Sequence, residues 1–177
     1  AKHQHLSHRW HRYSVSTLIG KTSPSESSAF HCASEKRPQL MNVKPLDAHF
    51  GAEVLGVELG KDVDHAMMQQ LTKALYSHRV IVIRDQHLDE HDYLTFGRAW
   101  GQPIPHVLDH LRMPEFPEMM TVGNTDKKDQ NEAVRNGTVL WHTDQSYEAV
   151  PASVTMLYSI KTPATGGETQ ICNMVAA

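Results

Sequence analysis

The feature that most constrains the fold of this chain is a change of sequence pattern near Met41. Residues 1–40 are rich in Ser and His and have almost no sustained apolar periodicity, so they cannot bury enough surface to offset the entropy lost on ordering. After Met41, short apolar runs alternate with glycines and prolines, which is typical of short strands and helices joined by tight turns. We therefore expect residues 1–40 to be a disordered extension and residues 41–177 to form one folded domain.

Two interpretations of the extension remain open. An Arg- and Ser-rich, acid-poor leader is typical of an organellar transit peptide, and its histidines could bind metal adventitiously. Met41 is the first methionine of the chain. This favours the alternative that residues 1–40 are an upstream extension without a function.

Charge is distributed unevenly along the chain and excludes one class of partner. Residues 1–40 carry a net charge of +4, whereas the remainder carries −7. An acidic globular part argues against a nucleic-acid partner, which would need a basic face. No apolar run approaches the ~18–20 residues of a membrane span, and Cys32 and Cys172 have neither zinc-site nor disulfide-framework spacing. We expect a soluble, cytoplasmic protein without a membrane or nucleic-acid partner, and a homo-oligomer remains open.

Two helices are expected in the first half of the folded part. Apolar residues recur at helical spacing over 64–78, where Asp64 is placed to cap the N-terminus. A second helix is expected from about Glu90 to Trp100, with Asp89 as its N-cap. Gly101 follows this segment and is expected to end the helix.

Strands are expected to alternate with these helices and then to dominate the end of the chain. One or two are expected within 42–60, and "VIVIR" (Val80 to Arg84) is a β-branched run typical of a buried strand. The remaining candidates are 119–124, Val139 to Tyr147, Ser153 to Lys161 and Glu168 to Met174. The three prolines between Gly101 and Met119 predict an ordered irregular loop.

Two His-x-Asp pairs occur, His87–Asp89 and His142–Asp144. Because the chain has thirteen histidines, chance alone produces on the order of one such pair. Asp89 is better placed to cap a helix than to bind a metal ion, and we therefore expect His87 to be a solvated residue of the preceding turn. In an extended strand, residues two apart point to the same face, so His142 and Asp144 can present a nitrogen and an oxygen to one divalent metal ion. The alternative is a solvated His–Asp pair at an exposed strand end.

The stretch from Trp141 to Met174 resembles the taurine dioxygenase (TauD/TfdA) family of Fe(II)- and 2-oxoglutarate-dependent dioxygenases. Members of that family have W-H-[ST]-D, an aromatic residue, a proline, a strand and then P-x-x-G-G-x-T. This chain supplies the matching residues in the same order: Trp141, His142, Thr143, Asp144, Tyr147, Pro151, Pro163, Gly166, Gly167 and Thr169. Upstream, "GAEVLGVEL" and "HRVIVIRDQHLDEHDYLTFGRAWG" are also similar to the family, so the resemblance begins at about Met41.

The resemblance implies a fold, a cofactor set and a reaction. The implied fold is α+β and mostly β, a double-stranded β-helix (jelly roll) with N-terminal helices packed on it and incomplete at the C-terminus. His142 and Asp144 would bind Fe(II), the Thr169 hydroxyl would contact the cosubstrate 2-oxoglutarate, and His106 and Tyr147 would contact the substrate. The implied reaction uses O₂ to hydroxylate a small organic acid, a sulfonate or an aryloxyalkanoate, while 2-oxoglutarate is decarboxylated to succinate.

This sequence departs from the family pattern in one respect. The family takes a third metal ligand, a histidine, and an arginine that pairs with 2-oxoglutarate from strands further along the chain. None of the residues after Asp144 is a histidine or an arginine. We therefore expect a truncated product that is inactive alone and exposes apolar strand faces. The alternative function is a non-catalytic jelly-roll binding domain or pseudoenzyme, whereas a zinc hydrolase is disfavoured because HExxH and paired-cysteine spacings are missing.

Overall fold

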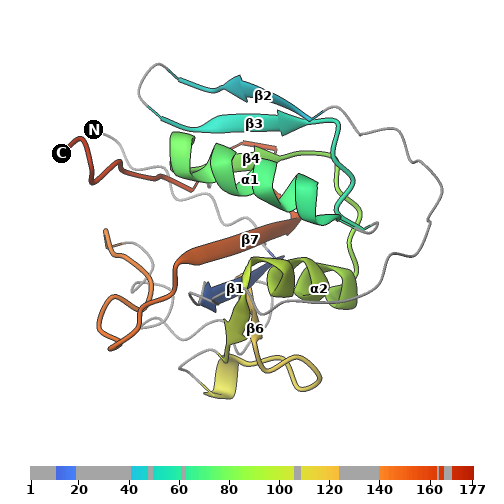
Figure 1. Cartoon of the computed structure of the whole chain (residues 1–177). Helices are drawn as coiled ribbons and strands as arrows, with labels where there is room; N and C mark the ends of the chain where they lie inside the picture. The colour runs from blue at the N-terminus through green and yellow to red at the C-terminus, as the bar shows by residue number, and fades with distance from the viewer. Residues whose placement is uncertain are drawn as a thin grey trace, which may run out of the picture. The chain divides into compact units, whose positions relative to one another are not determined.

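The structure is a computed structural model that describes most of the chain after residue 40 and one stretch before it (Figure 1). The described residues are 11–18, 41–47, 50–60, 63–105, 109–123, 140–162, 164–165 and 169–177, and for 11–18 only the backbone is described. The elements are β1 (His11–Leu18), β2 (Asn42–Pro45), β3 (Ala52–Leu55), α1 (His65–His78), β4 (Ile81–Ile83), α2 (Glu90–Trp100), β5 (Gln102–Ile104), the 3-10 turn η1 (Asp109–Leu111), β6 (Met119–Gly123) and β7 (Val154–Lys161).

The chain divides into two compact units, each with its own sheet. The first unit comprises residues 1–19 and 93–171, and the second comprises residues 20–92 and 172–177. The chain passes from the second unit to the first within α2, between Asp92 and Tyr93.

The second unit is built on a three-stranded sheet in the order β2-β3-β4. β2 and β3 pair antiparallel, and β3 and β4 pair parallel. Parallel neighbours cannot be joined by a tight turn, so the chain between them makes a crossover, and α1 supplies it (Figure 1). β3, α1 and β4 therefore form a βαβ unit.

The core of this unit lies where β3 and α1 bury their apolar residues. Ala52 and Val54 alternate along β3 and are buried, as a period of two requires. Met67, Leu71 and Ala74 are the buried residues of α1. The helical spacing expected from the sequence is confirmed, with Leu71 fully buried.

Hydrogen bonds cap both ends of α1. The Met67 amide donates to Asp64 Oδ1 at 2.7 Å, so the expected N-cap is confirmed. At the other end, Arg79 takes a left-handed conformation (φ 69°), and its amide donates to the Leu75 carbonyl. The helix thus begins and ends at residues whose geometry satisfies otherwise unpaired backbone groups.

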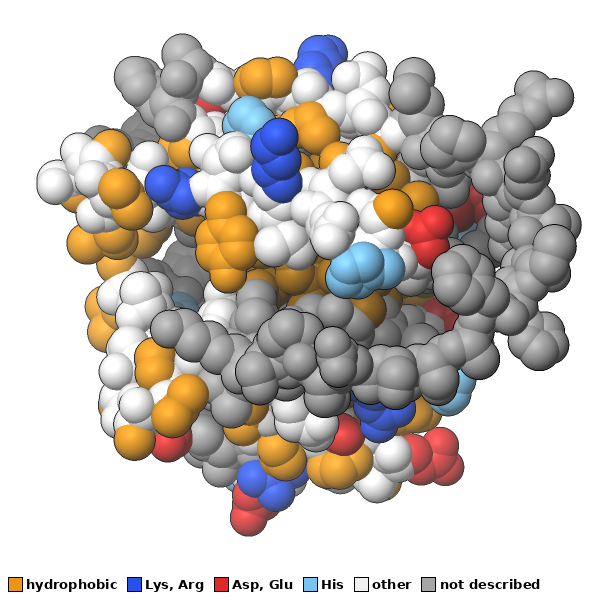
Figure 2. Space-filling view, in the orientation of Figure 1, with side chains coloured by type: hydrophobic (Ala, Val, Ile, Leu, Met, Phe, Trp, Pro, Cys, Tyr) orange, Lys and Arg blue, Asp and Glu red, His pale blue; other side chains and the backbone are white. Residues whose placement is uncertain are grey.

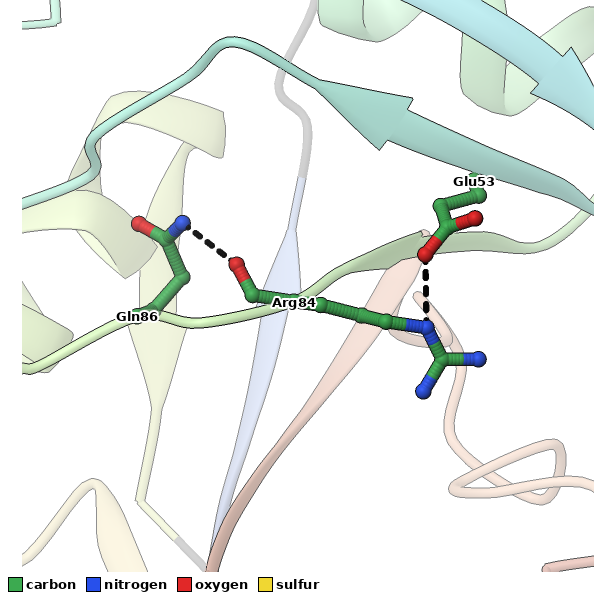
Figure 3. A network of polar contacts seen from close by, with 3 residues as sticks. All are labelled: Glu53, Arg84 and Gln86. Carbon is green, nitrogen blue, oxygen red and sulfur yellow. Dashed lines mark hydrogen bonds and ion pairs between the residues drawn. The ribbon is translucent and has the colours of Figure 1, made fainter.

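The Gln86 side chain ties the segment after β3 to the segment after β4. The Leu59 amide donates to Gln86 Oε1 at 2.8 Å, and Gln86 Nε2 donates to the carbonyls of Val57 (2.9 Å) and Arg84 (2.8 Å). Figure 3 shows the last of these bonds and the ion pair from Arg84 Nε to Glu53 Oε1. Arg84 is more than half exposed, so we assign the stability of this region to the Gln86 bonds rather than to the ion pair.

The first unit is built on a sheet in which β1 is central. β1 pairs antiparallel with β5, β6 and β7. β7 alternates between buried Val154 and Met156 and exposed Thr155 and Leu157, so one face of its first half is buried.

Helix α2 packs on this sheet through aromatic side chains. Asp89 Oδ1 accepts the Asp92 amide at 2.8 Å, which confirms the expected N-cap. The rings of Tyr93 on α2 and Tyr158 on β7 have centroids 5.7 Å apart. Gly101 follows the helix with φ 150°, so the expected end of α2 is also confirmed.

Three features of the sheets differ from expectations drawn from the sequence. Residues 11–18 form strand β1, whereas we expected no order in 1–40; the rest of that segment lies outside the described residues. β4 is half-buried, not buried, because it is the last strand in the order β2-β3-β4. The described strands form two separate sheets of a mixed α/β structure and do not establish a jelly roll.

No helix in the described part of the chain combines the length and apolarity needed to cross a lipid bilayer.

The hydrogen bonds of Gln86 predict a measurable cost of removing them. Gln86→Met keeps the length of the side chain but leaves the Leu59 amide and the Val57 carbonyl without that partner, which should lower the free energy of unfolding by ~1–3 kcal/mol. Gln69→Met is the control, because Gln69 is exposed on α1 and its replacement should change stability by less than about 0.5 kcal/mol. Urea denaturation of the full chain measures both; equal effects would contradict the role of Gln86.

Candidate metal centre

The pair His142 and Asp144 lies in an irregular turn that precedes β7. We expected a strand from Val139 to Tyr147, and that prediction is wrong for residues 140–147. The chain turns over Asp144 to Tyr147, Gln145 takes a left-handed conformation (φ 52°), and the Glu148 amide donates to the Gln145 carbonyl at 3.1 Å. The turn-forming Asp and Ser side chains prevail here over the β-propensity of the flanking residues. Val139 itself lies outside the described residues.

The turn brings the two candidate ligand atoms close together without a strand. His142 Nε2 and Asp144 Oδ1 are 3.5 Å apart. The two side chains are 52% and 44% exposed, so both are in contact with solvent. The proximity expected from the sequence is present, but a turn produces it.

A backbone hydrogen bond fixes the orientation of the His142 ring. Nδ1 lies 2.7 Å from the Leu140 carbonyl oxygen. A carbonyl only accepts, so Nδ1 carries the proton, and in the neutral ring the lone pair is on Nε2. The Nε2 lone pair then faces a carboxylate oxygen, and two such acceptors can share a metal cation.

The separation of the two atoms, 3.5 Å, is slightly longer than that of two ligands bound to one metal ion. Ligand atoms about 2.1 Å from one ion, at angles near 90–109°, are roughly 3.0–3.4 Å apart. The Nδ1–H bond to a backbone carbonyl is also the arrangement commonly found around metal-binding histidines. Two ligands of this N/O set therefore fit a first-row divalent ion.

A third ligand does not join this pair within the described part of the chain. Among those residues, the group of three His, Cys, Asp or Glu side chains with ligand atoms within 4.8 Å of one another is Asp89, His91 and Asp92. Asp89 and His91 are exposed, and Asp89 Oδ1 already accepts the Asp92 amide at the start of α2. The capping role expected for Asp89 explains this cluster without a metal ion.

The remaining expected site residues are Tyr147, Thr169 and His106. Tyr147 lies in the same turn as Asp144 and is 69% exposed. Thr169 is exposed in an irregular segment after β7; the expected strand from Glu168 to Met174 is wrong for residues 169–174. His106 lies outside the described residues.

The buried Gln145 is a residue of this turn that sequence reasoning missed. It is only 6% exposed although its neighbours are exposed. Among the described residues, its Oε1 has no hydrogen-bond partner. A glutamine between Asp144 and Ser146 carries no sequence signal of burial, so only the folded turn shows it.

Several apolar side chains close to the pair in the sequence are exposed. Leu140, Trp141, Tyr147 and Val150 have exposed fractions of 72, 69, 69 and 65%. Figure 2 shows apolar side chains at the surface on the face in view. Large apolar side chains exposed so close together in the sequence are a feature that binding surfaces share.

The sequence around the pair matches a known family. Residues 42–177 match the model described as "Taurine catabolism dioxygenase TauD, TfdA family". The chain belongs to this family. The match includes every described element of this TauD/TfdA chain except β1.

Two relatives of this TauD/TfdA chain are named as alpha-ketoglutarate-dependent dioxygenases. It is 31% identical over 138 residues to an alpha-ketoglutarate-dependent sulfate ester dioxygenase of Pseudomonas putida, with 77% of this chain and 43% of the relative covered. It is 30% identical over 139 residues to the (S)-phenoxypropionate/alpha-ketoglutarate-dioxygenase of Sphingobium herbicidovorans, with 77% and 46% covered. The chain spans less than half the length of these two relatives.

A solved structure of the family is similar over a smaller part. The taurine dioxygenase from Burkholderia xenovorans is 33% identical with a TM-score of 0.41, and the match covers 44% of this chain and 28% of that chain. The family assignment therefore rests on the sequence match.

The His142 hydrogen bond predicts one tautomer. In the neutral ring, the proton should be on Nδ1, because only that nitrogen faces the Leu140 carbonyl. Long-range ¹H–¹⁵N NMR correlations distinguish the two tautomers, and the spectrum of His142→Ala assigns the signal. A neutral ring with its proton on Nε2 would contradict the geometry described above.

Proposed function

We propose that this chain supplies two Fe(II) ligands, His142 and Asp144, for the 2-oxoglutarate-dependent oxygenation of a small organic acid. The observation that carries the proposal is the 3.5 Å separation of His142 Nε2 and Asp144 Oδ1, with the opposite ring nitrogen bonded to Leu140. This geometry lies within the residues that match the TauD/TfdA family.

The chain's own residues would hold and orient the metal ion. His142 donates the Nε2 lone pair, and its bond to the Leu140 carbonyl keeps the ring from rotating. Asp144 supplies a negative charge that partly balances the cation. Bound Fe(II) with 2-oxoglutarate supplies the activation of O₂.

Other residues of the chain would bind the cosubstrate and substrate. The Thr169 hydroxyl donates to a 2-oxoglutarate carboxylate, and His106 and Tyr147 contact the substrate. The exposed apolar residues around the pair, Trp141 among them, would exclude water once substrate and cosubstrate are bound.

The substrate class is inferred from the relatives. Their names specify a sulfate ester, phenoxypropionate and, in a relative from Cupriavidus pinatubonensis, 2,4-dichlorophenoxyacetate. These molecules share an anionic group and an organic body. We propose a substrate of the same kind for this chain.

Succinate formation tests the proposal. With Fe(II), 2-oxoglutarate, O₂ and a panel of sulfate esters and aryloxyalkanoates, a protein in which this chain is extended by the family's later strands, with their histidine and arginine, should release succinate. Because losing an outer partner of a metal ligand already costs ~10–100-fold, His142→Ala and Asp144→Ala should each lower the rate at least about 100-fold.

Thr143→Ala is the matched control, since Thr143 lies between the two ligands and is exposed; its rate should stay within about twofold of the unsubstituted chain. Undiminished turnover in His142→Ala or Asp144→Ala would overturn the ligand assignment.

The second candidate is a non-catalytic binding domain. It is favoured by the observation that the described residues place no third ligand beside the pair. In that case the same extended protein binds a panel acid without Fe(II) and releases no succinate, and this result would overturn the proposed oxygenation.

A further inference from the structure

Strand β1 has hydrogen-bonded neighbours along both of its edges. On one edge, residues 11–17 pair with β7, with a register shift between His11 and Arg12. β6 pairs with residues 11–15 and β5 with residues 16–18. Because β7 already occupies one edge, β5 and β6 must lie end to end along the other.

β1 is also the only link between these strands in the described sheet. Within the described residues, the ladders of β5, β6 and β7 are all formed with β1. β6 and β7 both run antiparallel to β1, so they run in the same direction and are separated by two strand spacings, about 9–10 Å. Without β1, two rows of backbone N–H and C=O groups would face each other across a gap one strand wide.

The strand that fills this gap comes from outside the family-matched part of the chain. The match begins at residue 42, whereas β5, β6 and β7 lie within it. The family-matched residues therefore build the two edges, and the preceding segment supplies the strand between them (Figure 1).

The sequence of β1 suits this position. Tyr13, Val15 and Thr17 alternate along "HRYSVSTL", and aromatic and β-branched residues favour strands. Their register partners on β7 are Tyr158, Met156 and Val154, which are half-buried or buried. The β-forming positions of β1 are thus opposite the positions of β7 that are removed from solvent.

We propose that β5, β6 and β7 form a strand-accepting slot, and that His11–Leu18 of the same chain is its bound segment. The slot takes an extended peptide that runs antiparallel to all three strands, a form of recognition in which main-chain hydrogen bonds supply the affinity. Thr17 pairs with Val154, the first residue of β7, so the bound segment also anchors the strand that follows the His142–Asp144 turn. This proposal rests on strand pairing and is independent of the proposed catalytic function.

Disulfide trapping in the full chain tests the slot and its register. In a background with Cys32→Ser and Cys172→Ser, two adjacent pairs are used, Val15→Cys with Met156→Cys and Ser14→Cys with Leu157→Cys. Facing residues of antiparallel strands have Cα atoms ~4.5–5.5 Å apart, which a disulfide can bridge. We expect at least one pair to form an intrachain disulfide under mild oxidation.

The matched control moves one cysteine along β7. Val15→Cys with Ile160→Cys places the second cysteine four residues from the register partner, about 13 Å along the strand, which is beyond the reach of a disulfide. Equal trapping of this control pair would contradict the register. Disulfide-linked dimers from the register pairs would show that the segment binds in trans and would overturn the same-chain assignment.

Hydrogen exchange of the unsubstituted chain is a second test of the pairing of β1, and it applies even if the cysteine variants do not fold. Amides of Arg12 to Thr17 should on average exchange at least about tenfold more slowly than in a synthetic peptide of the same sequence, because both edges of this strand are paired within the sheet. Exchange at the peptide rate would overturn the proposal.

Discussion

The hydrogen bond between His142 Nδ1 and the Leu140 carbonyl is the interaction on which the candidate site depends. It determines which ring nitrogen keeps a lone pair and holds that nitrogen 3.5 Å from Asp144 Oδ1. Two such acceptors at that distance favour a cation between them. Metal affinity would therefore be encoded in the conformation of a short turn, and the left-handed Gln145 is the residue at which this turn departs from extended backbone.

The turn is supported by the strand that follows it. β7 begins at Val154, and its first residues pair with β1 while its Tyr158 ring lies against Tyr93 of α2. Because main-chain hydrogen bonds and an aromatic contact hold this strand in place, it restricts the movement of the irregular segment that precedes it. Sites of this kind commonly combine a rigid scaffold with chemically active residues in the connecting segments.

Local signals in the sequence predicted the helices well and the end of the chain poorly. Asp64 and Asp89 cap their helices as expected, because a cap depends on residues three positions apart. β1 was missed, because its pairing partners lie 84 to 150 residues further along the chain and such pairing leaves no local pattern. The strand expected around His142 was wrong, since side chains that favour turns outweighed β-propensity there. The closeness of His142 and Asp144 was anticipated, but the burial of Gln145 depends on the folded turn and has no counterpart in the sequence.

The most direct test of the account is pulsed electron paramagnetic resonance of the chain loaded with Mn²⁺ as a substitute for Fe(II). We predict nitrogen modulation from a single imidazole, and this signal should disappear in His142→Ala and persist in His91→Ala, which alters the acidic cluster at the start of α2. Modulation that survives His142→Ala, or that disappears only in His91→Ala, would show that the ion is bound elsewhere and would contradict the central claim.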